Sequence, residues 1–243
     1  MNDPFPVEPL QPHPITNSAV QSGDSAALGE NALTASPAIP AGFQFASVTA
    51  GIKASGKPDF AVVLAQDGTT AAAMFTSNRV VAAPVTVGRK HLLRSGGRVR
   101  VVAVNSGNAN CATGAAGLEI CQAVCASAAE LFGCAAHEVF PSSTGIIGVP
   151  LQGEKLIAAM PAVQRALGHS ALHFFDFSKA ILTTDTRAKV ASAVIDVEGK
   201  PIRLLGCCKG AGMIHPELVP HATMLVYLFT DAVVTPADLS SFL

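Results

Sequence analysis

The dipeptide Ala222-Thr223 stands directly before an apolar run, Met224 to Phe229, late in the chain. The hydroxyl of Thr223 can attack the carbonyl of Ala222, shift the acyl group from nitrogen to oxygen, and let water release it. The threonine left behind has a free α-amino group with an ordinary pKa of about 7.7–8.0, which lets it act as its own general base. The same residues also fit a buried strand that merely begins with threonine, a β-branched residue favoured in strands. The dipeptide alone is compatible with both interpretations.

Three other short stretches could serve such chemistry. A segment before the dipeptide contains one lysine, Lys209, among glycines at 206, 210 and 212, which allow a ligand to approach the backbone closely. In Pro141 to Gly148, a Ser/Thr-Gly run after a short strand can present a hydroxyl beside a backbone N–H, the pair that stabilises a tetrahedral oxyanion. Asn105 to Asn110 is dense in small polar groups, although a plain strand-to-helix turn would look the same.

Strands and helices must position these stretches. Alternating or apolar runs predict strands at 43–49, 60–65, 70–76, 99–104, 139–140, 190–197, 202–205 and 224–229. Apolar residues at helical spacing predict helices over 118–131, ended by Gly133, and over 156–167, ended by Gly168, with a further helix near 174–181. Strands predominate and the helices gather in the middle, which indicates a layered α+β fold rather than a doubly wound sheet.

Composition excludes several classes of function. Of 243 residues, 49% are hydrophobic and 14% charged, with a net charge of −1 and no basic run, so nucleic acid is not an expected partner. No apolar stretch approaches the roughly 20 residues that span a bilayer, and no membrane partner is expected. The six cysteines form no CxxC pair and the histidines have no metal-ligand spacing. We therefore predict a reduced, cytoplasmic setting without a metal, with Cys121 and Cys125 as small core residues.

Residues 1–40 differ from the rest of the chain. Closely spaced prolines give way to serine, asparagine, glycine and alanine, and there is no lysine or arginine. This composition fits neither a signal peptide nor a transit peptide and predicts a disordered tail, with the folded domain over 41–243.

Seven motifs occur in an order that resembles the ornithine acetyltransferase (glutamate N-acetyltransferase) family of arginine biosynthesis. The similarity runs from about Gly42 to the C-terminus, and the ordered set is far more specific than any one motif. The motifs are Gly-Ile-Lys at 51–53, Phe-Thr-Ser-Asn-Arg at 75–79, Asn-Ser-Gly-Asn-Ala-Asn at 105–110, Ser-Thr-Gly-Ile-Ile-Gly at 143–148, Thr-Thr-Asp-Thr at 183–186, Lys-Gly-Ala-Gly-Met-Ile at 209–214 and Ala-Thr-Met-Leu at 222–225.

The resemblance implies a role for several positions. Thr223 would be the nucleophile, released by cleavage at Ala222–Thr223 into an α chain (41–222) and the start of a β chain (223–243). Thr144 and Gly145 would form the oxyanion hole. Thr183 and Lys209 would contact substrate, with Lys209 facing the substrate carboxylate or serving structurally, and the 105–110 loop would support the site. The implied fold is the αββα arrangement shared with self-processing aminopeptidases, incomplete here at the C-terminus.

The resemblance also implies an activity. The family moves acetyl from N-acetylornithine to glutamate through an acetyl-threonine intermediate, with no cofactor, and its α and β chains are expected to assemble as a heterotetramer. Whether acetyl-CoA also serves as an acetyl donor is not encoded in any motif. Two alternatives stay open: a self-processing N-terminal-threonine amidohydrolase or aminopeptidase, and a non-catalytic remnant.

Two departures from the family pattern bear on these expectations. The segment between Lys209 and Ala222 is three residues longer than in the family, which could displace Thr223 relative to Lys209. The chain ends at Leu243, about twenty residues after Thr223, whereas family members continue much further and supply more substrate contacts. The sequence therefore predicts a chain that lacks part of the family site: a fragment, a frameshifted product, or one component whose partner is encoded elsewhere.

Overall fold

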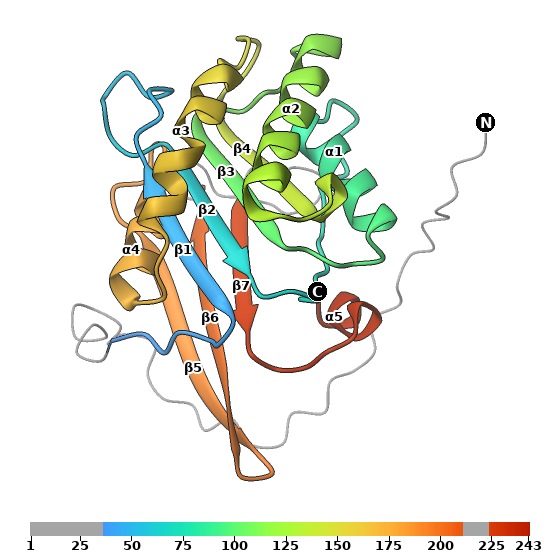
Figure 1. Ribbon diagram of the computed structural model, residues 1–243, viewed down its shortest axis with the longest axis vertical. Helices are drawn as coiled ribbons and strands as arrows, with labels where there is room; N and C mark the ends of the chain where they lie inside the picture. Colours follow the sequence, from blue (N-terminus) through green and yellow to red (C-terminus); the bar gives the residue numbers. More distant parts are fainter. Residues whose placement is uncertain (1–35, 211–223) are drawn as a thin grey trace. The chain divides into compact units, whose positions relative to one another are not determined.

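A four-stranded sheet forms the centre of the computed structural model, which describes residues 36–210 and 224–243 (Figure 1). Its order is β1-β2-β3-β4, with β1–β2 and β2–β3 antiparallel and β3–β4 parallel. The parallel step requires a crossover, which the helix between β3 and β4 provides. The strands are β1 (Phe43–Val48), β2 (Phe60–Ala65), β3 (Val101–Asn108) and β4 (Val139–Ile146).

Three helices cover one face of this sheet: α1 (Ala83–Arg94), α2 (Gly114–Phe132) and α3 (Gly153–Ala166). Their apolar stripes share one core with β1, β2, β3 and β4. The predicted periodicities of α2 and α3 are confirmed: Cys121 and Cys125 are buried in α2, and Leu156 and Met160 in α3. Helix α2 ends at Gly133, whose left-handed conformation (φ 65°) is the usual helix stop. A single turn of 3₁₀ helix, Ala136–Glu138, leads into β4.

Helix α2 is also long and apolar enough to cross a membrane by length and composition, which the sequence reading did not anticipate. Its buried positions, among them Cys121, Val124 and Ala128, pack against the sheet and the neighbouring helices. A core helix of a soluble domain has the same composition, so this helix is explained by the core it helps to form.

A second sheet packs on the other face of the first. It contains β5 (Lys189–Val197), β6 (Lys200–Lys209) and β7 (Leu225–Thr230), all antiparallel, with β6 in the middle. Helix α4 (Ala171–Ala180) completes this core. Aromatic rings dominate the contact: Phe45 of β1 meets Phe174 at 5.1 Å and Phe229 at 5.3 Å between centroids, both edge to face.

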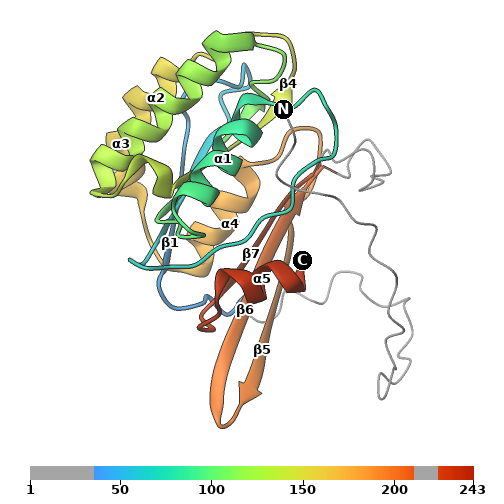
Figure 2. The same cartoon turned by 90° about the vertical axis from the view of Figure 1, so that its right-hand side faces the viewer.

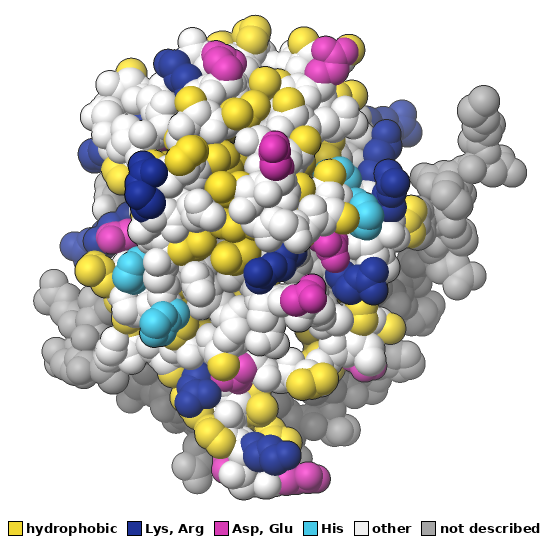
Figure 3. Space-filling view, in the orientation of Figure 1, with side chains coloured by type: hydrophobic (Ala, Val, Ile, Leu, Met, Phe, Trp, Pro, Cys, Tyr) yellow, Lys and Arg dark blue, Asp and Glu magenta, His cyan; other side chains and the backbone are white. Residues whose placement is uncertain are grey.

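The layers of residues 37–243 are therefore helices, sheet, sheet, which confirms the α+β class (Figure 2). Within the described residues, the outer face of the β5–β7 sheet carries exposed apolar side chains instead of the second helical layer of an αββα fold. These are Ile195, Val197, Leu204, Val226 and Leu228, which are 39–69% exposed. Figure 3 shows hydrophobic side chains on the projecting β5–β6 hairpin at the bottom of the view.

The structure differs from the predicted elements in two respects. Residues 70–76 form no strand, and only Thr70 makes an isolated bridge, to Arg98, because an alanine-rich run has little strand propensity. Helices α1 and α5 (Pro236–Phe242) were not predicted, although Pro84 and Pro236 both stand at the start of a helix, where proline is favoured. Strand β7 lies at an edge of the described sheet, and its outward residues Val226 and Leu228 are exposed.

Candidate functional site

The predicted nucleophile and cleavage position, Thr223 and Ala222, lie outside the described residues, as do 1–35 of the predicted tail. The nearest described part of that segment is the start of β7, where Leu225 pairs with Lys209 of β6. The strand register thus brings the chain that follows Thr223 next to Lys209. The predicted site is built around this end of the second sheet.

The Lys209 side chain bonds to two other predicted site residues. Its ammonium donates to the Thr144 hydroxyl and to the Thr183 hydroxyl, each at 2.8 Å from Nζ to Oγ1. Thr144 comes from β4, Thr183 from the turn after α4, and Lys209 from the last position of β6. Side chains that are 26 and 65 positions away from Lys209 therefore meet at one cation.

The Lys209 side chain is almost fully enclosed, with 5% exposed, whereas Thr183 is exposed and Thr144 half-buried. Burial lowers the pKa of Lys209 below its ordinary value; Asp185 opposes this shift and Lys189 adds to it. An ammonium has three protons, and the two hydroxyls accept two of them. Since the Thr144 oxygen accepts from Lys209, its own O–H must point elsewhere.

Gly145, the second predicted oxyanion residue, lies where β4 comes closest to β3. It pairs with Gly107 and has a φ of +138°, and a Cβ built on it would lie 2.2 Å from the Gly107 carbonyl carbon. Only glycine fits both the conformation and the space. The two strands continue through both motifs, so 105–108 and 143–146 are strand residues, contrary to the predicted loop and short strand.

The amides of the 105–110 motif brace this junction from within. Ser143 donates to the Asn105 Oδ1 at 2.6 Å, and Asn105 donates to the Asn108 carbonyl at 2.8 Å. Asn108 donates to the carbonyl of Val149 at 3.0 Å and accepts from the Asn110 N–H at 2.7 Å. These bonds tie the motif to β4 and to the segment after it.

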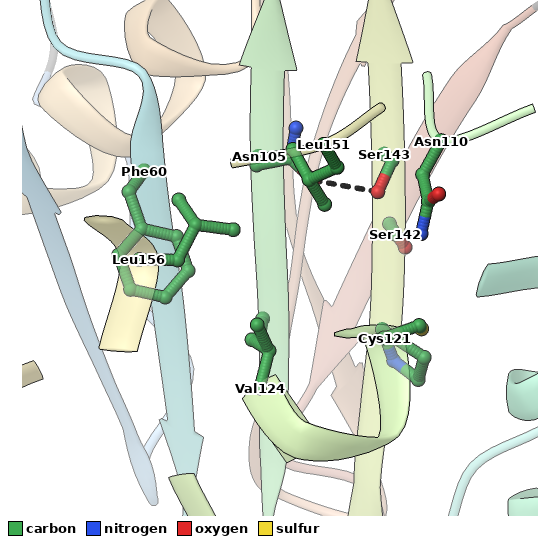
Figure 4. Close-up of a pocket in the computed structure, with 11 residues that line it drawn as sticks. Phe60, Asn105, Asn110, Cys121, Val124, Ser142, Ser143, Leu151 and Leu156 are labelled. Atoms are coloured by element: carbon green, nitrogen blue, oxygen red, sulfur yellow. Dashed lines mark hydrogen bonds between the residues drawn. The ribbon is translucent and has the colours of Figure 1, made fainter. Parts of the chain in front are cut away.

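A small cavity beside this network, between α2 and the sheet, encloses about 20 Å³ (Figure 4). Asn105, Ser143 and Asn110 line it together with apolar side chains such as Phe60 and Leu156. That volume holds about one water molecule, so an amino-acid substrate cannot bind there. The predicted site residues Thr144, Gly145, Thr183 and Lys209 do not line this cavity.

Asp185 belongs to the Thr-Thr-Asp-Thr motif at 183–186, but the sequence predicted no role for it. Its carboxylate is buried, accepts the Gly210 N–H at 2.9 Å and pairs with the Lys189 ammonium. Burial alone would raise its pKa, but the hydrogen bonds from Lys189 and Gly210 outweigh burial and hold the pKa below its ordinary value. Asp185 thus fixes the backbone at the end of β6, where the segment that contains Thr223 begins.

Over residues 36–210 and 224–243, no group of three or more metal-ligating side chains is placed to hold an ion. The cluster at the sheet end is cationic and rich in hydroxyls. Such an arrangement can bind or polarise oxygen atoms that carry negative charge.

Fold and cluster together define a layered α+β domain with hydroxyl and ammonium groups gathered at one end of two facing sheets. The ArgJ family matches residues 44–243, and the chain belongs to this family. It is 42% identical over 207 residues to the arginine biosynthesis bifunctional protein ArgJ of Rhodopirellula baltica and 43% identical over 199 residues to that of Nitratidesulfovibrio vulgaris. These matches cover 85% and 82% of this chain but 49% of each relative, so the chain spans about half the length of these curated relatives.

Two crystal structures have the same fold. The arginine biosynthesis bifunctional protein ArgJ of Bacillus halodurans matches with a TM-score of 0.69 and 32% identity, over 73% of this chain and 91% of that chain. The ornithine acetyltransferase of Mycobacterium tuberculosis, complexed with ornithine, matches with a TM-score of 0.63 and 36% identity, over 74% and 94%. The predicted fold and family are therefore confirmed.

Proposed function

We propose that this protein transfers an acetyl group from N-acetylornithine to glutamate, with Thr223 as the nucleophile after cleavage of the Ala222–Thr223 bond. The observation that carries the proposal is the Lys209 ammonium, bonded to both Thr144 and Thr183 beside the start of β7. The family match, the ornithine-bound relative and the names of the curated relatives agree with this substrate class.

In the proposed reaction the Thr223 hydroxyl attacks the acetyl carbonyl of N-acetylornithine, and the free α-amino group takes its proton. The resulting oxyanion lies against the Thr144 hydroxyl and the Gly145 N–H. Collapse breaks the amide C–N bond, and ornithine leaves with the proton. The amine of glutamate then attacks the acetyl-threonine ester and restores the hydroxyl.

Two roles are open to Lys209 in this scheme. Bound to both hydroxyls, its ammonium turns the Thr144 O–H toward the oxyanion. Its third proton has no acceptor within residues 36–210 and 224–243, and in this scheme it faces a substrate carboxylate. The first role acts in the transition state and the second in substrate binding, so kinetics can separate them.

Cleavage would give two chains that stay together. In support, the matched crystal chains are covered to 91% and 94%, whereas half of each curated relative lies beyond the match. A heterotetramer of α and β chains, a cytoplasmic location and acetyl-CoA as a second acetyl donor are further parts of the proposal. No relative reported above favours the amidohydrolase or aminopeptidase alternative.

Intact-mass spectrometry tests the cleavage. We expect an N-terminal chain ending at Ala222 and a peptide beginning with Thr223, and no cleavage in Thr223→Ala, because alanine has no hydroxyl to attack. Thr230→Ala, at the far end of the strand that follows Thr223 in the sequence, is the matched control and should cleave normally. Cleavage that persists in Thr223→Ala would show that another residue is the nucleophile.

Incubation with N-acetylornithine and glutamate tests the transfer, with and without a separately expressed C-terminal half of a full-length relative. N-acetylglutamate formed only with both amino-acid substrates supports the proposal. Release of acetate with no acceptor would favour the hydrolase alternative, and no reaction in either condition would favour the non-catalytic one.

A further inference from the structure

We infer that Lys53 is a positioning residue for Thr183: its ammonium, fixed by the buried Asp59 loop, holds the last carbonyl of α4 and thereby sets the turn that contains Thr183. The functional part of this inference rests on the proposed function, since Thr183 matters there as a substrate contact. The structural part stands on contacts between residues far apart in the sequence.

The base of the arrangement is the Asp59 carboxylate, which is fully buried. It accepts the backbone N–H of Ala50 at 2.6 Å, Ile52 at 2.6 Å and Lys53 at 2.8 Å, and a longer bond from Gly51 at 3.2 Å. Four donors converging on one carboxylate leave this loop little freedom, because a buried charge is costly without them. The backbone of Lys53 is therefore fixed before its side chain makes any contact.

The Lys53 ammonium contacts a residue far away in the sequence, at the end of α4. It donates to the Ala180 carbonyl at 3.0 Å and to the Pro58 carbonyl at 2.9 Å, and the Ser106 hydroxyl donates to the same Ala180 oxygen at 2.5 Å. Ala180 is the last residue of α4, where carbonyls lack helical partners and a cation is favoured. Two donors thus fix the point where the helix ends.

Thr183 follows three residues later and accepts from Lys209. Ser106, the second donor to Ala180, is the strand partner of Thr144, the other hydroxyl that Lys209 bonds. The methylene stem of Lys53 also lies against Gly107, where an added Cβ would come 3.1 Å from its Cγ. Gly107 in turn faces Gly145. Lys53 therefore contacts both the β3–β4 junction at Gly107 and the end of α4 at Ala180. The two threonines that accept from Lys209 lie next to these two places.

A simple helix cap would explain the bond to Ala180 but not the rest. A cap is usually supplied by a residue near the helix end in sequence, whereas Lys53 is 127 positions from Ala180 and is held by a dedicated buried carboxylate. Burial lowers the pKa of Lys53, with Asp59 opposing and Lys57 and Lys209 adding to the shift, so the two site lysines also lie within electrostatic range of each other.

Hydrogen–deuterium exchange on the 243-residue chain tests the structural part. The amides of Ile181 and Leu182 bond to Phe177 and Lys179 carbonyls, so their exchange reports on the end of α4. Lys53→Met should speed their exchange about three- to tenfold and leave the amides of α1 unchanged. Lys53→Arg should restore much of the protection, because it keeps the charge. Lys57→Met, an exposed lysine on the same loop, should match the wild type.

Equal exchange at 181–182 in Lys53→Met and Lys57→Met would overturn the inference, and so would a uniform rise that includes α1. Should Lys53→Met fail to fold, Ser106→Ala removes the other donor to Ala180 and must show the same local effect. None of these readouts depends on turnover, so a failure of the proposed function would leave the exchange result intact.

Steady-state kinetics test the functional part in an assembly that shows transfer. Lys53→Met should raise KM for the amino-acid substrates by more than it lowers kcat, since Thr183 is assigned to binding. Adding it to Thr183→Ala should cost nothing further, because both changes remove the same contact. Additive losses would mean that Lys53 does not act through Thr183.

Discussion

The Lys209 ammonium points two of its protons at threonine hydroxyls from two different elements. A hydroxyl that accepts from a cation is both oriented and made a better donor, because the chain of hydrogen bonds polarises it. In the proposed reaction, Thr144 is therefore prepared to donate toward a developing negative charge before substrate arrives. Such preorganisation usually contributes more to the rate of acyl transfer than any other single effect.

At this scale we predict that Thr144→Ala lowers kcat about 10²–10³-fold with little change in KM, because its hydroxyl acts mainly in the transition state. Lys209→Met should lower kcat by a similar factor, and the double variant should be no worse than either single one. Steady-state kinetics on an assembly that shows transfer would measure this. Thr144→Ser, which keeps the hydroxyl, is the control. A rise in KM alone for Lys209→Met would instead assign Lys209 to the substrate carboxylate.

At the scale of elements, the site depends on the contact between β3 and β4 at Gly107 and Gly145. Gly145→Ala places a Cβ 2.2 Å from backbone, in a conformation that side chains avoid. Gly148→Ala is a matched control, because it also has a positive φ (+79°) but open space around it. We expect the control to cost about 1–2 kcal/mol and Gly145→Ala clearly more, on the order of 3–5 kcal/mol. Calorimetric melting separates the two: equal losses of stability would mean that crowding does not matter.

Asp185 connects the turn after α4 to the end of β6, and its lowered pKa makes this connection sensitive to pH. A carboxyl whose pKa is lower in the folded state stabilises the protein above its unfolded pKa of about 3.9, and this stabilisation is lost as pH falls through the folded value. We therefore predict that Asp185→Asn lowers Tm at pH 7 and that the gap from wild type narrows below about pH 4.

Thermal melts from pH 7 to pH 3 would measure that gap. Asp196→Asn is the control: Asp196 is an exposed carboxyl near the end of β5, and its replacement should leave Tm almost unchanged. A gap that stays constant down to pH 3 would show that the charge of Asp185 is not what holds Gly210.

The elements differ in how far the sequence predicts them. Helices α2 and α3 were predictable because Cys121, Leu156 and Met160 recur with the helical period and a glycine stops each pattern. Strand-like alternation is absent from 105–108 and 143–146, where close packing between β3 and β4 needs glycine and small polar residues. The sequence therefore predicted loops there. The identity of Thr144, Gly145, Thr183 and Lys209 came from motif resemblance. The bonds of Lys209 to the two threonines and of Asp185 to Gly210 join residues far apart in the sequence, and no local pattern encodes them.

At the scale of the whole domain, both faces of the first sheet are covered, but among the described residues only one face of the second sheet is. The first is enclosed between three helices and the second sheet, whereas the outer face of β5–β7 carries apolar side chains and no helix among the described residues. Leu228 lies over Gly206 and is 69% exposed, and Val226 beside it is 52% exposed. The αββα arrangement that the resemblance implied would place helices on this face. Since the curated relatives are about twice as long as the match, their remaining half is a candidate source of that layer.

The exposed face and the β7 edge lead to a prediction about association. Burying one large apolar side chain contributes roughly 1.5–3 kcal/mol, so pairing two such faces is favourable, and an uncovered edge strand offers unpaired backbone groups as well.

We expect the 243-residue chain alone to self-associate, and Leu228→Lys to shift it toward monomer in size-exclusion chromatography with light scattering. Leu172→Lys is the matched control, because Leu172 is 64% exposed but lies on α4, and should change nothing. Adding the C-terminal half of a full-length relative should disperse the wild-type chain in the same way. A wild-type chain that is already a monodisperse, cooperatively melting monomer would show that this face tolerates water and needs no partner.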